Sequence, residues 1–168
     1  RIVRGKVTVH MEPLLLKTLC ERAVEASSPL LAARQQELLV DIPREPVVLQ
    51  GDLVRLSQVL SNLLNNASKF TDPGGKISLG ASLQGDELSI SVTDTGQGIE
   101  AEFLPHIFDL FAQGDQALDR AQGGLGIGLT LVKHLVHLHK GRVEAYSEGR
   151  GRGCRISVSF PARLLPQG

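Results

Sequence analysis

Apolar residues recur every three or four positions in three long stretches of the chain, the spacing of a helix with one buried face. The first stretch covers residues 12–35, where Pro13 is tolerable because it would lie in the first turn. The second covers residues 52–70 and begins at Asp52, a residue type that caps helix N-termini well. The third runs from about 126 to 139. We therefore expect three long helices.

Shorter stretches alternate apolar and polar residues, as strands with one buried face do. Within residues 76–94, two such runs joined at Gln84-Gly85-Asp86 predict a hairpin. The remaining predicted strands are residues 6–10, 37–42, 47–50, 142–148 and 154–160. Three helices and an antiparallel-rich sheet indicate an α+β fold, a two-layer α/β sandwich with helices on one face of the sheet and solvent on the other.

The composition is that of an ordinary globular protein: 168 residues suit one domain, and 42% of them are hydrophobic. Eighteen basic residues balance eighteen acidic ones, so neither nucleic acid nor an anionic membrane is expected as the main partner. No apolar run is long enough to cross a membrane, and no signal peptide is recognisable. Cys20 and Cys154 lack metal-site spacing, and we expect buried, reduced thiols in a cytoplasmic protein.

The stretch "GGLGIGLTLVK", residues 123–133, places closely spaced glycines directly before a predicted helix. Glycine permits close approach to the backbone, and a helix N-terminus attracts anions, so the combination suits phosphate. It is not a Walker loop, because Gly-Lys followed by Ser or Thr occurs nowhere in the chain. Alternating glycines after a strandless run do not fit a dinucleotide loop either. A mobile linker before a helix remains an alternative interpretation.

On the second predicted helix a polar rib lies along one edge of the core face. Asn62, Asn66 and Lys69 fall within about 60° of one another at about 100° per residue. Two interpretations are open: a solvated face, or neutral oxygens for Mg²⁺ together with a charge for phosphate. The expected core face consists of Leu53, Leu56, Leu60, Leu63, Ala67 and Phe70.

Directly after a predicted strand comes "DTGQGI", residues 94–99. The Asp94 carboxylate can accept a hydrogen bond from an exocyclic amine such as that of adenine. Gly96 and Gly98 would let a flat base lie against the backbone. With Ala101 they also fit a dinucleotide fingerprint, but that motif requires a helix and then a parallel strand, and no strand pattern follows.

Four motifs in order carry a resemblance: "LSNLLNNASKFT", "DTGQGI", "IFDLFAQ" and "GGLGIGLTLVK". They resemble the N box, first glycine box, F box and second glycine box of the catalytic, ATP-binding domain of bacterial sensor histidine kinases. This domain shares a superfamily with gyrase, the ninety-kilodalton heat-shock chaperones and the mismatch-repair ATPases. The resemblance covers nearly the whole chain and implies the Bergerat fold, a mixed, mostly antiparallel sheet packed on three long helices.

The resemblance implies ATP and Mg²⁺ as ligands and assigns a role to each matched residue. Asn66, helped by Asn62, would coordinate Mg²⁺, and Lys69 would meet phosphate. Asp94 would hold the adenine amine. The remaining nucleotide-binding residues that it implies are Gly96, Gly98, Phe108, Arg120, Gly124, Gly126, Gly128 and Leu129.

The resemblance also implies a mobile ATP lid at about residues 109–123. Phe108 and Phe111 would anchor its base, and Arg120 within it would reach the phosphates. Beyond the lid, the glycines of the second glycine box would wrap the triphosphate with the N–H groups of the following turn.

Two departures from the family pattern bear on activity. Leu125 stands where many relatives have threonine or serine, which keeps open a regulatory module that binds ATP without turnover. Asn62 stands where gyrase-like ATPases place a glutamate that activates water. Because an amide cannot act as a general base, the sequence favours a kinase over a gyrase-like ATPase.

Two-component signal transduction requires a phosphoacceptor histidine, and none of the five histidines has the expected acidic flanks. His134, His137 and His139 are better explained by a solvated helix face than by a metal site. We expect residues 1–168 to form one catalytic domain, with residues 1–5 as a linker remnant. Its partners would be the dimerisation domain of the same protein, absent from this chain, and the receiver domain of a response regulator.

Overall fold

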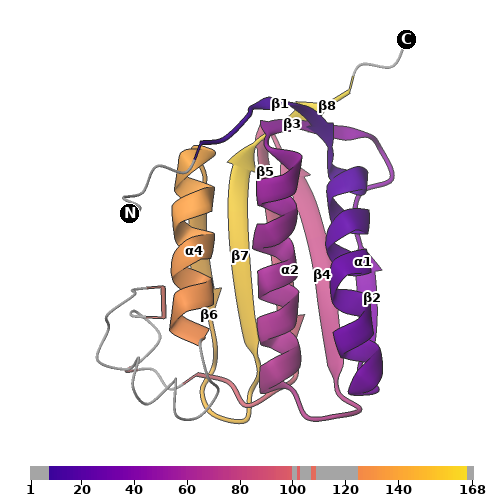
Figure 1. Ribbon diagram of the computed structural model, residues 1–168, viewed down its shortest axis with the longest axis vertical. Coiled ribbons are helices and arrows are strands. Elements are labelled where there is room, and N and C mark those ends of the chain that lie inside the picture. The colour runs from indigo at the N-terminus through magenta and orange to yellow at the C-terminus, as the bar shows by residue number, and fades with distance from the viewer. Residues whose placement is uncertain (1–7, 100–101, 103–106, 109–124, 166–168) are drawn as a thin grey trace.

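The computed structural model describes residues 8–99, 102, 107–108 and 125–165 (Figure 1). Three helices lie side by side over one face of a five-stranded sheet, with α2 between the other two. Within the described ranges the helices are α1 Leu16–Ala33, α2 Leu53–Phe70 and α4 Leu125–Leu138. The expected two-layer α+β sandwich is therefore confirmed.

The five-stranded sheet has the order β2-β4-β5-β7-β6. Of the pairs described in this sheet, β2 with β4 is parallel and the others are antiparallel. The predicted hairpin is confirmed, with Gln84 opposite Glu87 and Gly85 in a left-handed conformation at φ 65°. The strands are β2 Glu37–Asp41, β4 Lys76–Gln84, β5 Glu87–Asp94, β6 Arg142–Tyr146 and β7 Cys154–Pro161.

A second, three-stranded sheet with the order β1-β3-β8 was not expected from the sequence. It consists of β1 Glu12–Leu15, β3 Val47–Gly51 and β8 Arg163–Leu164. The prediction of a helix from residue 12 is wrong, because the first four residues pair antiparallel with β3 instead. Pro13 lies in this strand, where its missing N–H matters little at an edge.

The strand predicted at residues 6–10 is also wrong over residues 8–10, which have no strand structure. The backbone N–H of His10 donates to the Asp52 carboxylate at 2.9 Å. Because this side chain satisfies an N–H that would otherwise pair with a neighbouring strand, residue 10 does not need a strand partner there. Residues 6 and 7 lie outside the described part of the chain.

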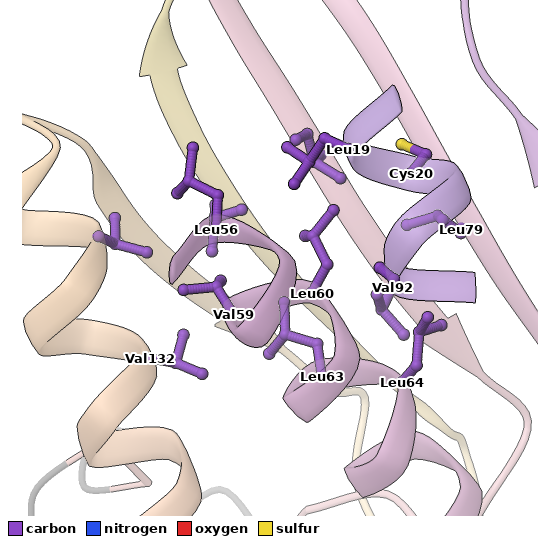
Figure 2. Packing of buried hydrophobic residues seen from close by; sticks show 14 of the residues in the cluster. Leu19, Cys20, Leu56, Val59, Leu60, Leu63, Leu64, Leu79, Val92 and Val132 are labelled. Carbon is purple, nitrogen blue, oxygen red and sulfur yellow. The ribbon is translucent and has the colours of Figure 1, made fainter. Parts of the chain in front are cut away.

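The core lies between the helices and the sheet, and α2 supplies its middle (Figure 2). Leu56, Leu60, Leu63 and Ala67 are buried as the periodicity predicts, whereas the terminal members of that face are half-buried. Each fully buried leucine contributes about 1.5–3 kcal/mol relative to an exposed one, so this face dominates the packing energy of the helix. Val59, which the predicted face omits, is buried as well, and α2 also packs against α4.

Both cysteines are free, as predicted. Cys20 is buried in the core, where burial, with a smaller contribution from Glu21, raises the pKa of its thiol to about 11. Cys154 is only half-buried, and burial together with the charge of Asp94 raises its pKa to about 12. Both thiols therefore stay protonated at neutral pH.

Asp52 caps α2 as predicted, accepting a hydrogen bond from the Arg55 N–H at 3.2 Å. Burial opposes ionisation of its carboxyl, but the hydrogen bonds from the His10 and Arg55 N–H groups hold its pKa below the ordinary value. The Asp52 N–H in turn donates to Nε2 of His139 at 3.0 Å. The start of α2 is therefore fastened to the end of α4.

The prediction of a solvated face is wrong for His139, which is buried. Its Nδ1 lies 2.7 Å from the Leu135 carbonyl oxygen, so both ring nitrogens are satisfied inside the protein. His134 and His137 are exposed, as expected. Among the described residues, no group of three or more His, Cys, Asp or Glu side chains is placed to hold a metal ion. No helix of the described part has the length and apolarity that a bilayer crossing requires.

Candidate functional site

The polar rib of α2 lies in its C-terminal half, and its three members differ in exposure. Asn62 is half-buried, Asn66 is 8% exposed and Lys69 is exposed. The amide nitrogen Nδ2 of Asn66 is buried without a hydrogen-bond partner among the described residues. A buried amide atom without a partner is costly, so a solvated face does not explain Asn66, and a ligand would.

Asn65 has the same property, because its Oδ1 is buried and has no partner among the described residues. The sequence interpretation omitted Asn65, which lies about 100° around the helix from Asn66. Two adjacent asparagines with buried amide atoms that lack partners among the described residues mark this turn as a candidate binding site. The sequence does not show which of their atoms are buried, so this signal required the structure.

Asp94 is the last residue of β5 and lies opposite Cys154 of β7. It is buried, and burial raises the pKa of its carboxyl above the ordinary value. The backbone N–H groups of Gly96 and Cys154 both donate to this carboxyl and partly offset that effect, with Gly96 at 2.8 Å from Oδ1. Because a carboxylate accepts about four hydrogen bonds, acceptor capacity remains for a ligand amine.

Gly96 and Gly98 are glycines because the protein's own backbone passes close to them. A Cβ atom on Gly96 would collide with the carbonyl group of Phe70 at the end of α2. Gly98 has a φ of 74°, and a Cβ atom there would collide with the carbonyl oxygen of Gly149. The sequence interpretation explained these glycines by the close approach of a flat base, but packing within the protein already requires them.

Backbone hydrogen bonds join three segments around Asp94. The N–H of Gln97 donates to the Phe70 carbonyl at 2.9 Å, which links the loop after β5 to the end of α2. On its other side, the N–H of Gly153 donates to the Gly96 carbonyl at 3.1 Å, and the N–H of Gly151 donates to the Gln97 carbonyl. Residues 94–99, here called the Asp94 loop, are therefore held from both sides.

The Ser147 side chain makes further hydrogen bonds to the Asp94 loop region that the sequence interpretation missed. Its Oγ accepts a hydrogen bond from the Ile99 N–H at 3.0 Å and donates to the Gly153 carbonyl at 2.7 Å. This hydroxyl connects the Asp94 loop to the glycine-rich segment between β6 and β7, where Gly149, Gly151 and Gly153 all have positive φ. The "GRGRG" pattern predicts a turn, but not its contact with another loop.

Part of the F box is described and is attached to α4. Ile107 is buried, Phe108 is half-buried, and the Phe108 carbonyl accepts a hydrogen bond from Oγ1 of Thr130 at 3.2 Å. The predicted lid at 109–123, with Phe111 and Arg120, and the first glycines of the second glycine box, with Gly124, lie outside the described residues.

Helix α4 begins at Leu125, so Gly126 and Gly128 lie in its first turn. Leu129 is 1% exposed and packs in the core. The first four N–H groups of a helix have no acceptor within it, so residues 125–128 provide the donors and the positive end of the helix dipole. The start of α4 lies at the same end of the molecule as the end of α2 and of β5 (Figure 1).

Buried amides, a buried carboxylate and a helix N-terminus therefore lie at one end of the helical layer. Residues 51–164 match the family profile described as "Histidine kinase-, DNA gyrase B-, and HSP90-like ATPase". The match covers more than half of the chain, which therefore belongs to this family.

Relatives of known name are longer proteins. The chain is 34% identical to "Hybrid signal transduction histidine kinase D" of Dictyostelium discoideum over 95% of its own length and 12% of that protein. It is also 34% identical to "Circadian input-output histidine kinase CikA" of Synechococcus elongatus, over 98% of its own length and 22% of that protein. The chain thus spans less than a quarter of the length of either relative.

Solved structures share the fold. "Mycobacterial sensor histidine kinase MprB" matches with a TM-score of 0.79 and 24% identity, over 93% of this chain and 100% of that one. A structure titled "Crystal structure of ShkA full-length in complex with AMPPNP" matches with a TM-score of 0.78 and 28% identity, over 96% of this chain and 33% of that one.

The collision at Gly96 leads to a stability prediction. We expect Gly96→Ala to lower the free energy of unfolding by about 1–3 kcal/mol, because the Phe70 carbonyl and the Asp94 loop must move apart. Gly80→Ala is the matched control, since a Cβ atom there would meet only the Asp41 oxygen at 3.6 Å. Urea unfolding followed by circular dichroism measures both. Equal stabilities of the two variants would contradict the prediction.

Proposed function

We propose that this chain is the ATP-binding catalytic domain of a sensor histidine kinase. It would bind Mg-ATP and donate the γ-phosphate to a histidine of a separate dimerisation domain in two-component signal transduction. Three features at one end of the fold carry the proposal: the Asn66 amide, whose Nδ2 is unpartnered in the described part of the chain, the buried Asp94 carboxylate and the start of α4. The family membership and the names of the relatives support it.

At the base end, Asp94 would accept a hydrogen bond from the exocyclic amine of adenine. Its carboxyl is already oriented by the N–H groups of Gly96 and Cys154, so little ordering is needed when the base binds. Gly96 and Gly98 support this indirectly, because they allow the loop to pack tightly between Phe70 and Gly149.

At the phosphate end, Asn66 is suited to Mg²⁺, because amide oxygens are ligands of this hard cation and an amide flip would turn its oxygen to the unpartnered position. Asn62, one turn earlier, would assist it, and the exposed Lys69 would contact phosphate. Bound Mg²⁺ would neutralise charge on the phosphoryl oxygens. The first turn of α4, with Gly126 and Gly128, would donate N–H groups to the triphosphate.

In the transfer step, the imidazole of the acceptor domain would attack the γ-phosphorus while ADP leaves. This chain would contribute orientation and electrostatic stabilisation and no nucleophile. Asn62 cannot remove a proton from water, which favours transfer to histidine over hydrolysis. We further propose that Arg120 and Phe111 act in a lid over the phosphates, and that a response-regulator receiver domain then accepts the phosphoryl group in the cytoplasm.

Asp94 provides the first test of this proposal. We expect Asp94→Asn to weaken ATP binding about 10- to 100-fold, since a charged hydrogen-bond acceptor contributes about 1.5–3 kcal/mol. The exposed Asp72 gives the matched control, Asp72→Asn, which should bind as the wild type does. Binding is measured by titration calorimetry. Unchanged affinity in Asp94→Asn would contradict the assignment.

The pKa of Asp94 adds a pH dependence with a definite sign. Burial raises this pKa in the free chain, whereas an amine donor favours the carboxylate and lowers it in the complex. At pH values near the raised pKa binding therefore releases protons, and affinity should fall as pH drops through that pKa. NMR titration of the Asp94 carboxyl carbon, with and without adenosine, measures this shift.

A transfer experiment distinguishes the proposal from its two alternatives. With γ-labelled ATP, we expect little label on the isolated chain and clear transfer to an added dimerisation domain that carries the acceptor histidine. Binding without transfer would favour a regulatory module, for which Leu125 is the motivating residue. Sustained hydrolysis without an acceptor would favour a gyrase-like ATPase and contradict the role given to Asn62.

A further inference from the structure

The end of α2 is capped by two side chains from a segment more than thirty positions earlier in the chain. Arg34 lies just after α1, and its Nε donates to the Ser68 carbonyl at 3.1 Å while its Nη2 donates to the Thr71 carbonyl at 2.9 Å. The last carbonyls of a helix have no partner within it, and they carry the negative end of its dipole. A guanidinium therefore satisfies these carbonyls both as donor and as charge.

Gln36 makes the same connection from inside the protein. Its Nε2 donates to the carbonyls of Ser68 at 3.0 Å and Thr71 at 2.8 Å, and lies 3.4 Å from that of Asp72. Its Oε1 accepts a hydrogen bond from Oγ of Ser68 at 2.6 Å. Both Gln36 and Ser68 are buried, so these hydrogen bonds are shielded from competing water.

The turn between these two residues brings them to the same target. Gln35 has a φ of 55°, a left-handed conformation that ends α1 and allows Arg34 and Gln36, on either side of it, to reach one helix end. The backbone continues the connection, because the N–H of Gly74 donates to the Arg34 carbonyl and the N–H of Glu37 to the Gly75 carbonyl. Arg34 and Gln36 are called here the α2 clamp.

The Phe70 carbonyl, in the same turn, is not bound by the clamp and has another partner. The Phe70 carbonyl accepts its hydrogen bond from the N–H of Gln97 in the Asp94 loop. The last turn of α2 is thus held by hydrogen bonds from both the clamp and the Asp94 loop. Asn66 and Lys69, the residues proposed for Mg²⁺ and phosphate, belong to this same turn and the one before it.

We infer that Arg34 and Gln36 are positioning residues for the nucleotide, fixing the Asn66 and Lys69 end of the site relative to Asp94. The inference rests on the proposed function. It also predicts an asymmetry, because the Asp94 loop has independent supports in β7 and Ser147, whereas the polar contacts described for the last turn of α2 are those of the clamp and the Gln97 N–H. Weakening the clamp should therefore impair phosphate binding more than base binding.

The test compares affinities for Mg-ATP and for adenosine, which lacks the phosphates. Gln36→Met keeps an uncharged side chain of similar length but removes the donor and acceptor. We expect its Mg-ATP affinity to fall about tenfold, since small misplacements of binding groups have effects of this size or larger, while adenosine affinity stays within about twofold. Gln50→Met on the exposed part of β3 is the matched control, with both affinities unchanged. Calorimetry measures Mg-ATP, and NMR titration measures adenosine.

Arg34 supplies a second variant and a conservative rescue. Arg34→Ala should also lower the affinity for Mg-ATP more than that for adenosine. Arg34→Lys should recover part of the lost Mg-ATP affinity, because lysine keeps the charge at the helix end but cannot bind two carbonyls as the guanidinium does. A purely structural cap would lower the unfolding temperature in these variants and leave the ratio of the two affinities as in the wild type.

Hydrogen exchange of the ligand-free chain gives a readout independent of nucleotide. In Gln36→Met the Gln97 amide should exchange roughly tenfold faster, while the Ile90 amide in β5 stays protected. Unchanged exchange, or equal changes in both affinities, would overturn the inference while leaving the proposed function standing. Failure of the wild-type chain to bind Mg-ATP would instead refute the proposed function, and the positioning role with it.

Discussion

The carbonyl oxygen of Phe70 is the point on which the arrangement of the site depends. It ends the helix that carries the asparagines and accepts the hydrogen bond from Gln97, and its position excludes any side chain at Gly96. One backbone group thereby sets how close α2 and the Asp94 loop can come. A site built on helix and strand ends gains accuracy in this way, because both ends are fixed by regular structure.

Helix α2 is fastened at both of its ends by polar groups, although its middle is held by leucines. At the start, the Asp52 N–H binds His139, which follows α4, and at the end Arg34 and Gln36 bind the carbonyls of the last turn. Apolar packing fixes which face of the helix is buried. The polar ends supply directional contacts that fix its position along the axis.

Local sequence signals predicted most of the fold. The 3.6-residue period gave three helices near their observed bounds, Asp52 caps the second, and the turn at Gly85 forms the hairpin. The predictions that were wrong all concern residues whose partners lie far away in the sequence. Residues 12–15 pair with β3, and His139 is buried by contact with the start of α2, neither of which a local pattern encodes.

The candidate site divides in the same way. Asn66, Asp94 and the glycines were predicted by residue type and spacing, and the structure places Asn66 and Asp94 at one end of the fold. Ser147, Asn65 and the α2 clamp were not predicted, because serine, asparagine, arginine and glutamine are common on protein surfaces. Only their burial and their hydrogen bonds to other segments distinguish them.

The central claim is that the Asn66 amide, whose Nδ2 has no partner among the described residues, binds a magnesium-bound nucleotide through its oxygen. The most direct measurement is titration of ATP with and without Mg²⁺ into the wild-type chain and Asn66→Ala. We expect Mg²⁺ to raise wild-type affinity by about tenfold or more, and most of that gain to disappear in Asn66→Ala while Mg²⁺-free binding changes little. An equal gain from Mg²⁺ in both proteins would contradict the claim.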